Sequence, residues 1–197
     1  MPSSIFTSSY ATAGFVIVVL CFFVAEVIGG KIIPWMRRRG ATVQRRTAGL
    51  NTLLYVSWVA VFGVSIPFAA NGIALLPDWV YYVGIGFMLA GIAFRQWAIA
   101  VLGRYFSGVI GVQKEQKVVE SGPYRLIRHP SYTGVLIFLV GMGLAVQSWA
   151  VVLIDVVIFG IFYGYRMFVE ERVLVRELGQ SYVEYMERTK RVIPYIV

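Results

Sequence analysis

The sequence has few charged residues, one histidine and one cysteine, and these scarcities exclude whole classes of protein. Charged residues make up 14% of its 197 positions, against about 25% in a soluble domain. Hydrophobic residues make up 58%, and the mean hydropathy is +0.73. This composition is typical of an integral membrane protein. The single cysteine, Cys21, lies in an apolar run and excludes an intrachain disulfide, and we expect no metal site.

Runs with almost no charge predict the membrane spans. A span needs about 20 apolar residues, and stretches of this kind cover residues 10–30, 49–70 and 79–102. A fourth stretch, 131–168, is too long for one helix and divides near Gln147-Ser148-Trp149. We therefore predict an all-α integral membrane protein with five transmembrane helices, of which the last two form a hairpin.

The last two predicted spans differ in length. The fourth, 132–146, is about 22 Å long at about 1.5 Å per residue, so we expect its polar start to be buried against protein. The fifth continues to about Leu178, where Gly179 stops it, and extends past the membrane. A short helix follows, with Ser181 as the predicted N-cap and Glu184 completing a capping box.

The positions of lysine and arginine predict the orientation. Of the 18 basic residues, 17 fall on one side of the predicted spans, and Arg95 lies within the third span. We therefore expect a cell-membrane protein with its N-terminus outside and its C-terminus in the cytoplasm, and without a cleaved signal peptide. The net charge of +8 then reflects topology and attraction to anionic lipid, and it does not indicate nucleic-acid binding.

Three features within the spans need an explanation. Arg95 and Asp155 are charges in apolar surroundings, where a charge is costly and usually paired or functional. Glu26, near the inner end of the first span, is a candidate partner for Arg95, whereas the partner of Asp155 stays open. The pattern Gly160-x-x-x-Gly164 predicts close packing of the fifth helix against the fourth.

Two polar groups at the predicted inner surface carry most of the functional information. Residues 122–134 include the only histidine, His129, at the start of the fourth span. Arg166 and Glu170 lie four residues apart on the fifth helix and so share one face. Each feature alone has an ordinary explanation, namely interfacial anchoring, helix punctuation or a surface ion pair. Together on one side of the membrane, they indicate one site.

These motifs closely resemble the isoprenylcysteine carboxyl methyltransferase family. The matching positions, in the family's order, are Gln113, Val118 to Tyr124, Arg128 to Gly134, Glu170-Glu171 and the tail with Gly179, Tyr182 and Tyr185. The resemblance covers about residues 100–194, and the chain looks like a compact prokaryotic member. The first three predicted spans form an N-terminal three-helix transmembrane region, 1–102, which matches the family only in character. The resemblance implies that the rest, 103–197, is a catalytic region made of a cytoplasmic loop, the hairpin 131–168 and C-terminal helices.

The resemblance also implies the site residues. In the family, S-adenosylmethionine is held by positions that correspond here to Gln113, Gln116, Lys117, Val118, Val119, Tyr124, His129, Pro130, Ser131, Tyr132 and Glu170. The family's substrate-contacting arginine corresponds to Arg166, which we expect to be the catalytic and substrate-binding residue. The spacer between Gln113 and Val118 is shorter than in the eukaryotic members.

The residue types suit transfer of a methyl group to a carboxylate. Glu170 can accept hydrogen bonds from the cofactor's amino group or ribose, His129 or Arg128 can meet its carboxylate, and aromatic rings attract the sulfonium cation. A carboxylate acceptor needs no general base, but it needs a partner for its charge, and Arg166 suits that role. Catalysis would then come mainly from positioning and desolvation. No Gly-rich Rossmann fingerprint is present, which excludes the soluble methyltransferase fold.

We therefore expect a methyltransferase at the membrane interface whose lipophilic, isoprenylcysteine-like substrate enters from the bilayer, with membrane lipids and no nucleic acid as partners. Two alternatives stay open. A phospholipid or small-amine N-methyltransferase would rely on Glu170 or Glu171 as a base. A non-catalytic lipid-binding membrane protein would keep the fold without affinity for the cofactor. The natural acceptor and the oligomeric state are not predicted.

Overall fold

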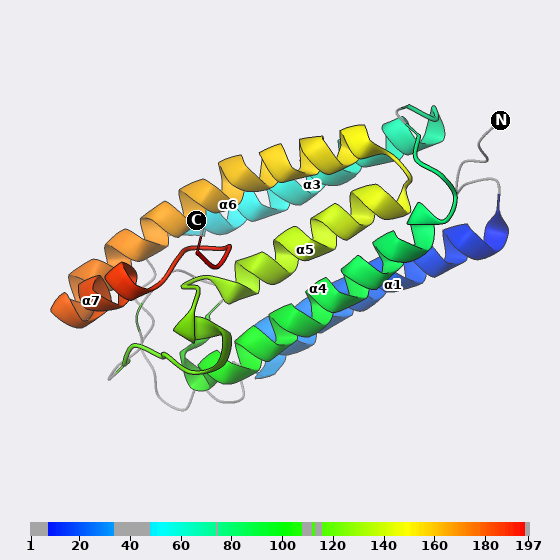
Figure 1. Cartoon of the computed structure of the whole chain (residues 1–197). Helices are drawn as coiled ribbons and strands as arrows, with labels where there is room; N and C mark the ends of the chain where they lie inside the picture. Colours follow the sequence, from blue (N-terminus) through cyan, green and yellow to red (C-terminus); the bar gives the residue numbers. More distant parts are fainter. Residues whose placement is uncertain (1–7, 34–47, 74, 108–111, 113–115, 196–197) are drawn as a thin grey trace.

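The computed structural model describes residues 8–33, 48–73, 75–107, 112 and 116–195. Within these residues the regular structure is helical (Figure 1), and the β pairing consists of two isolated bridges, Leu75–Ser148 and Ile127–Lys190. The prediction of an all-α membrane protein is confirmed.

The apolar helices follow the predicted segments closely. The first two are α1 (Ser9–Val27), which continues as the π-helical turn η2 (Ile28–Ile32), and α3 (Ala48–Ala70). The next three are α4 (Val80–Leu102), α5 (Pro130–Ala145) and α6 (Trp149–Leu178). A polar helix, α7 (Gln180–Arg188), and two short 3-10 turns, η3 (Gly103–Tyr105) and η4 (Gly122–Arg125), complete the described elements.

Length and composition make the chain a multi-pass membrane protein. Three helical stretches are long and apolar enough to cross a membrane, Ser9–Gly30, Val80–Tyr105 and Trp149–Leu178. Two further apolar helical stretches, Leu54–Phe68 and Pro130–Ala145, are shorter. The count of five spans and the orientation of the termini stay predictions.

The helices form a bundle around α5, with α4 and α6 on either side of it (Figure 1). Helix α1 packs beside α4, and α3 packs beside α6. The start of α5 is polar yet buried, as expected: Ser131 and Tyr132 are each 8% exposed. The division of the chain after residue 102 stays a prediction.

Glycines allow α4 and α5 to approach each other closely. A Cβ added to Gly84 would lie 2.2 Å from the backbone nitrogen of Ala145, and one added to Gly91 would lie 2.6 Å from that of Phe138. The close-packing prediction for Gly160-x-x-x-Gly164 is wrong, because among the described residues no atom of another element lies within 4 Å of a Cβ added at either position. Small residues permit a close approach, but α6 packs through another face, which carries Asp155, Phe159 and Tyr163.

The turn between α5 and α6 lies where the sequence predicts it. Gln147 adopts a left-handed conformation with φ of 59°, and its side-chain amide donates to Asp78 Oδ1 at 3.0 Å. Ser148 is the N-cap of α6, and its hydroxyl donates to the carbonyl of Ile73 at 2.8 Å. Both contacts hold the turn against the connection between α3 and α4.

The end of α6 is also as predicted, but the start of α7 is not. Gly179, with φ of 61°, ends α6 after Leu178. The same glycine is the N-cap of α7, so Ser181 already lies inside that helix. The Ser181 hydroxyl donates backward to the Leu178 carbonyl at 2.9 Å, and the prediction of a Ser181 cap is therefore wrong. Gly179 alone connects α6 to α7, because a glycine adopts a left-handed conformation without strain.

Candidate active site

The described residues enclose a cavity of about 590 Å³ at the end of the bundle that carries α7. This volume lies within the range of about 300–1,000 Å³ that is usual for small-molecule sites. All five apolar helices, the segment 116–119 and α7 contribute to its wall. One part of the wall is apolar and consists of Phe22, Phe23, Val27, Leu54, Trp58, Val173 and Leu174.

Most of the residues predicted for the site line this cavity. They are Gln116, Lys117, Val118, Val119, Tyr124, His129, Ser131, Tyr132, Arg166 and Glu170. Pro130 does not line it, since it is buried at the first position of α5, where its fixed φ suits the helix start. Gln113 lies outside the described residues. Residues more than 50 positions apart in the sequence thus meet around one cavity.

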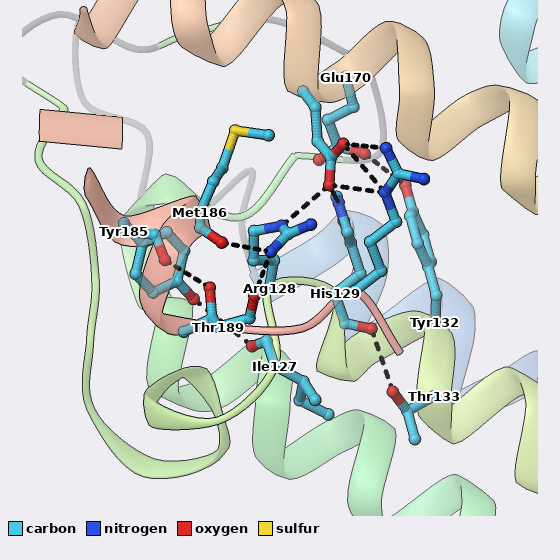
Figure 2. Close-up of polar contacts among 11 residues, drawn as sticks. Ile127, Arg128, His129, Tyr132, Thr133, Glu170, Tyr185, Met186 and Thr189 are labelled. Atoms are coloured by element: carbon cyan, nitrogen blue, oxygen red, sulfur yellow. Dashed lines mark hydrogen bonds and ion pairs between the residues drawn. The ribbon is translucent and has the colours of Figure 1, made fainter. Parts of the chain in front are cut away.

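The C-terminal segment holds the loop before α5 in place (Figure 2). The backbone amides of Arg128 and His129 donate to the carbonyls of Lys190 and Arg191, at 2.7 and 2.9 Å. The Tyr185 hydroxyl of α7 donates to the Tyr124 carbonyl at 2.8 Å. Tyrosine has an ordinary pKa of about 10 and is therefore a donor at neutral pH, and burial raises the pKa of Tyr185 further. The loop is therefore fixed by contacts from residues 185–191.

Glu171 is the centre of a buried ion cluster. Its carboxylate is 4% exposed, and it accepts hydrogen bonds from Arg128 Nε at 3.0 Å and from Arg191 Nη2 at 2.8 Å. His129 Nε2 lies 3.4 Å from Glu171 Oε1. Arg128 also donates to the carbonyls of Met186 and Thr189 (Figure 2). A cofactor carboxylate that meets Arg128 would therefore share it with internal partners.

Glu170, the neighbour of Glu171, takes part in a separate chain of hydrogen bonds that borders the cavity. Arg166 Nε donates to the Tyr132 hydroxyl at 2.8 Å, and that hydroxyl donates to Glu170 Oε2 at 2.7 Å. The Tyr132 ring stacks on His129, with centroids 5.4 Å apart (Figure 2). Successive helix positions differ by about 100°, so one glutamate faces the cavity and the other faces the loop.

The charge in the third apolar helix also belongs to the cavity wall. Arg95 donates through Nε and Nη2 to the Glu26 carboxylate, the latter at 2.6 Å, and through Nη1 to the Ser131 carbonyl at 2.9 Å. The pairing with Glu26 is confirmed. Both side chains line the cavity, which the sequence analysis did not predict. The position of Arg95 inside an apolar span was the sequence feature that indicated a paired or functional charge.

Asp155 has a structural contact at a distance from the cavity. It is fully buried in α6, and the Ser65 hydroxyl of α3 donates to its Oδ1 at 3.3 Å. Among the described residues, nothing donates to Oδ2. Asp155 is not part of the cavity wall. The pair therefore connects α3 to α6 and has no place in the candidate site.

The sequence of the chain is similar to a known family and to several known proteins. The model of the isoprenylcysteine carboxyl methyltransferase (ICMT) family matches residues 84–176. Protein-S-isoprenylcysteine O-methyltransferase B of Arabidopsis thaliana is 32% identical over 120 residues, which cover 60% of this chain and 61% of that protein. The protein-S-isoprenylcysteine O-methyltransferase of Schizosaccharomyces pombe is 30% identical over 114 residues, or 57% of this chain and 48% of that protein. The chain thus spans about three-fifths or less of the length of these curated relatives.

A solved structure shares the fold. It is that of the eukaryotic intramembrane Ras methyltransferase ICMT, with a TM-score of 0.64 and 23% identity. The superposition covers 94% of this chain and 67% of that one. The residues that the family model matches, 84–176, include Tyr132, Arg166, Glu170 and Glu171. The resemblance of this chain to the isoprenylcysteine carboxyl methyltransferase family, which its motifs indicate, is confirmed.

Proposed function

We propose that the protein is an S-adenosylmethionine-dependent methyltransferase that esterifies the carboxylate of a lipophilic, isoprenylcysteine-like acceptor at the membrane interface. The observation that carries this proposal is the hydrogen-bonded series Arg166–Tyr132–Glu170, which lines a cavity whose wall also carries apolar side chains. Such a wall suits an acceptor with a charged head and a hydrocarbon chain.

The residues around the polar part fit the cofactor. Glu170 offers a carboxylate to amino or hydroxyl donors, and the rings of Tyr124, Tyr182 and Tyr185 line the same space. Aromatic faces attract a cation by up to about 2 kcal/mol when it is desolvated. When bound, S-adenosylmethionine supplies a methyl group on a positively charged sulfur, which keeps the electron pair of the broken bond and becomes a neutral thioether.

The basic residues in the wall suit an anionic acceptor. Arg166 lies in α6 between Tyr163 and Glu170, and it is 4% exposed. A buried guanidinium binds a carboxylate through two parallel hydrogen bonds and fixes its orientation. Tyr132 and Glu170 hold Arg166 in place, because the hydroxyl accepts from its Nε. The chain's own contribution is then orientation of the acceptor oxygen and exclusion of water.

An N-methyltransferase fits the site less well. An amine acceptor must lose a proton, and Glu171 does not suit the role of base because Arg128, His129 and Arg191 surround its carboxylate. Glu170 would have to serve alone, beside a permanent positive charge at Arg166. That charge would also repel an ammonium acceptor.

We further propose that the cavity faces the cytoplasm of a cell membrane. Two segments lie at the same end as the cavity, namely the described loop before α5 and helix α7 (Figure 1). These segments are rich in lysine and arginine. The positive-inside trend favours the cytoplasmic side for such segments.

Radiolabelled methyl transfer in membranes tests the proposed function. An S-farnesylcysteine analogue and phosphatidylethanolamine are supplied as methyl acceptors in parallel assays. Binding of S-adenosylhomocysteine is measured separately by calorimetry. We expect label on the prenylcysteine only, in a form that mild base hydrolyses, as for an ester. Label on phosphatidylethanolamine alone would favour the N-methyltransferase. Absence of both transfer and cofactor binding would favour the lipid-binding protein.

A further inference from the structure

Two helix pairs of the bundle are held together in different ways. Glycines of α4, among them Gly84 and Gly91, lie directly against the backbone of α5, and such contacts limit how far one helix can slide along the other. On α3 and α6, a Cβ added at Gly63, Gly160 or Gly164 meets no neighbour within 4 Å among the described residues. The register between α3 and α6, which also pack against each other, must therefore depend on other contacts.

Hydrogen bonds join α3 and α6 at two levels. The Ser65 hydroxyl donates to Asp155 Oδ1 at 3.3 Å, and the Trp58 indole donates to the Tyr163 hydroxyl. From the first level to the second, α3 runs back by seven residues and α6 runs forward by eight. The helices are therefore antiparallel, and the two levels are about two turns apart. The Ser65–Asp155 pair thus determines the level at which Trp58 meets Tyr163.

The Ser65–Asp155 pair is poorly suited to stability alone. Asp155 is 0% exposed and Ser65 is 2% exposed, and nothing among the described residues donates to Asp155 Oδ2. A buried polar atom without a partner is costly. Replacing a buried charged group by an apolar side chain of similar volume is often neutral or stabilising, whereas fixing a register is a well-attested role of buried polar residues.

The register of α3 decides where one wall of the cavity lies. Leu54, Tyr55 and Trp58 of α3 line the cavity, and so do Tyr163 and Arg166 of α6. A slip of α3 by one turn, about 5 Å, would displace this largely apolar wall relative to the guanidinium of Arg166. The residues predicted to hold the cofactor lie outside α3, so the slip would leave them in place.

From this arrangement we propose that Asp155 is a positioning residue for methyl transfer. Its hydrogen bond with Ser65 fixes the register of α3 against α6, and the register places the apolar wall of α3 relative to Arg166. The proposal rests on the proposed function, because the effect on catalysis acts through the acceptor. The role requires an oxygen at position 155 that accepts from Ser65, and it does not require a charge.

Substitutions of the pair test this role through catalysis. Asp155→Asn keeps an accepting oxygen, Asp155→Leu has a similar volume without one, and Ser65→Ala removes the donor. Asp155→Leu and Ser65→Ala should each lower kcat/KM for an S-farnesylcysteine analogue by about tenfold to a hundredfold, since a misplacement of about 1 Å can cost about a hundredfold. Asp155→Asn should retain the value of the unmodified protein. In Asp155→Leu, the affinity for S-adenosylhomocysteine and the thermal stability should not fall.

A distance measurement reads the register without turnover. In a Cys21→Ala background, nitroxide labels are attached to Ile66→Cys on α3 and Arg176→Cys on α6, both at exposed positions. Ile66 is next to Ser65, and Arg176 is 21 residues beyond Asp155, so the labels are separated mainly along the helix axes. Their distance should be the same with aspartate or asparagine at position 155. With leucine it should shift or broaden by up to about 5 Å, one helical turn.

The possible outcomes separate this proposal from the proposed function. An unchanged label distance or an unchanged kcat/KM in Asp155→Leu would overturn the role of Asp155. So would a loss of activity in Asp155→Asn as large as that in Asp155→Leu, or a loss that is matched by a fall in thermal stability. Failure of the unmodified protein to methylate the analogue would instead overturn the proposed function, while the label distances still decide whether Asp155 sets the register.

Discussion

At the scale of single residues, two adjacent glutamates in α6 have different environments. Glu170 borders the cavity and accepts from Tyr132, whereas Glu171 is enclosed by Arg128, His129 and Arg191. The first is placed to contact a ligand, and the second holds the loop and the C-terminal segment together. Substitution should therefore affect ligand binding at one position and stability at the other.

We expect Glu170→Ala to weaken binding of S-adenosylhomocysteine by about 1.5–3 kcal/mol, the value of a hydrogen bond to a charged group, with little change in thermal unfolding. Glu171→Ala should lower stability by about 3–5 kcal/mol, because it leaves buried cations without their partner. Calorimetric titration and thermal unfolding in detergent measure both effects. Equal losses of affinity without destabilisation would contradict this assignment.

Arg166 separates the two acceptor classes. If the nucleophile is a carboxylate, Arg166→Lys should keep part of the methyl transfer and Arg166→Ala should lose most of it, because the alanine variant lacks the charge. The rate of the unmodified protein should be flat from about pH 6 to 8, since a carboxylate with a pKa near 4 is ionised throughout. Methyl transfer by the three proteins across this range is the measurement. An active alanine variant with a rate that rises with pH would favour an amine acceptor.

At the scale of elements, the α4–α5 contact is the closest in the described bundle, and glycines determine it. The distance of 2.6 Å from a Cβ at Gly91 to the backbone of Phe138 leaves no room for a methyl group. On α6, by contrast, Gly160 has open space at the same position. The two sites differ in their neighbours and share the same helical backbone.

We expect Gly91→Ala to destabilise the protein by about 1–3 kcal/mol, as overpacking usually does. Because alanine has the higher helix propensity, Gly160→Ala should be neutral or stabilising by up to about 1 kcal/mol. Thermal unfolding of the two variants in the same detergent compares them directly. A loss of stability at Gly160 as large as that at Gly91 would show that α6 packs there against an element outside the described contacts.

At the scale of the whole molecule, the cavity, α7 and the loop before α5 lie at one end of the bundle, and the turn between α5 and α6 lies at the other (Figure 1). Buried core residues, among them Val18, Val61 and Phe159, lie between the cavity and the second end. This asymmetry suits an enzyme that takes a water-soluble cofactor from one side and a lipophilic acceptor from the adjacent leaflet. Because the two ends of the bundle differ, labelling a cysteine at each end tests the orientation of the protein in the membrane.

In a Cys21→Ala background, Gln180→Cys should be protected from an impermeant thiol reagent in intact cells, and Asn71→Cys should react. Both positions are exposed, and the distribution of lysine and arginine places them on opposite sides. Permeabilised cells provide the control, since both cysteines should then be labelled. Reaction at position 180 in intact cells would reverse the proposed orientation.

The sequence by itself determined the features that depend on neighbouring residues. Apolar run length predicted the five apolar helices, and Gly179 predicted the end of α6. The spacing of four residues between Arg166 and Glu170 predicted a shared face, since helical geometry relates such positions whatever the fold. The polar start of α5 could be predicted as buried because the helix is too short to cross the membrane. Its first residues would then lie inside the membrane, where polar groups must be covered by protein.

Only the tertiary structure decided which distant residues meet. The Glu171 cluster depends on Arg191, twenty positions further along the chain, and no local pattern marks that arginine. The side of α6 that packs against α5 was mispredicted from Gly160 and Gly164, because a small residue permits a close contact without determining its partner. The cavity wall likewise brings together Phe22, Trp58 and Tyr163 from three helices. Such contacts depend on how the helices pack against one another. That packing results from interactions among all the helices and cannot be deduced from one local segment.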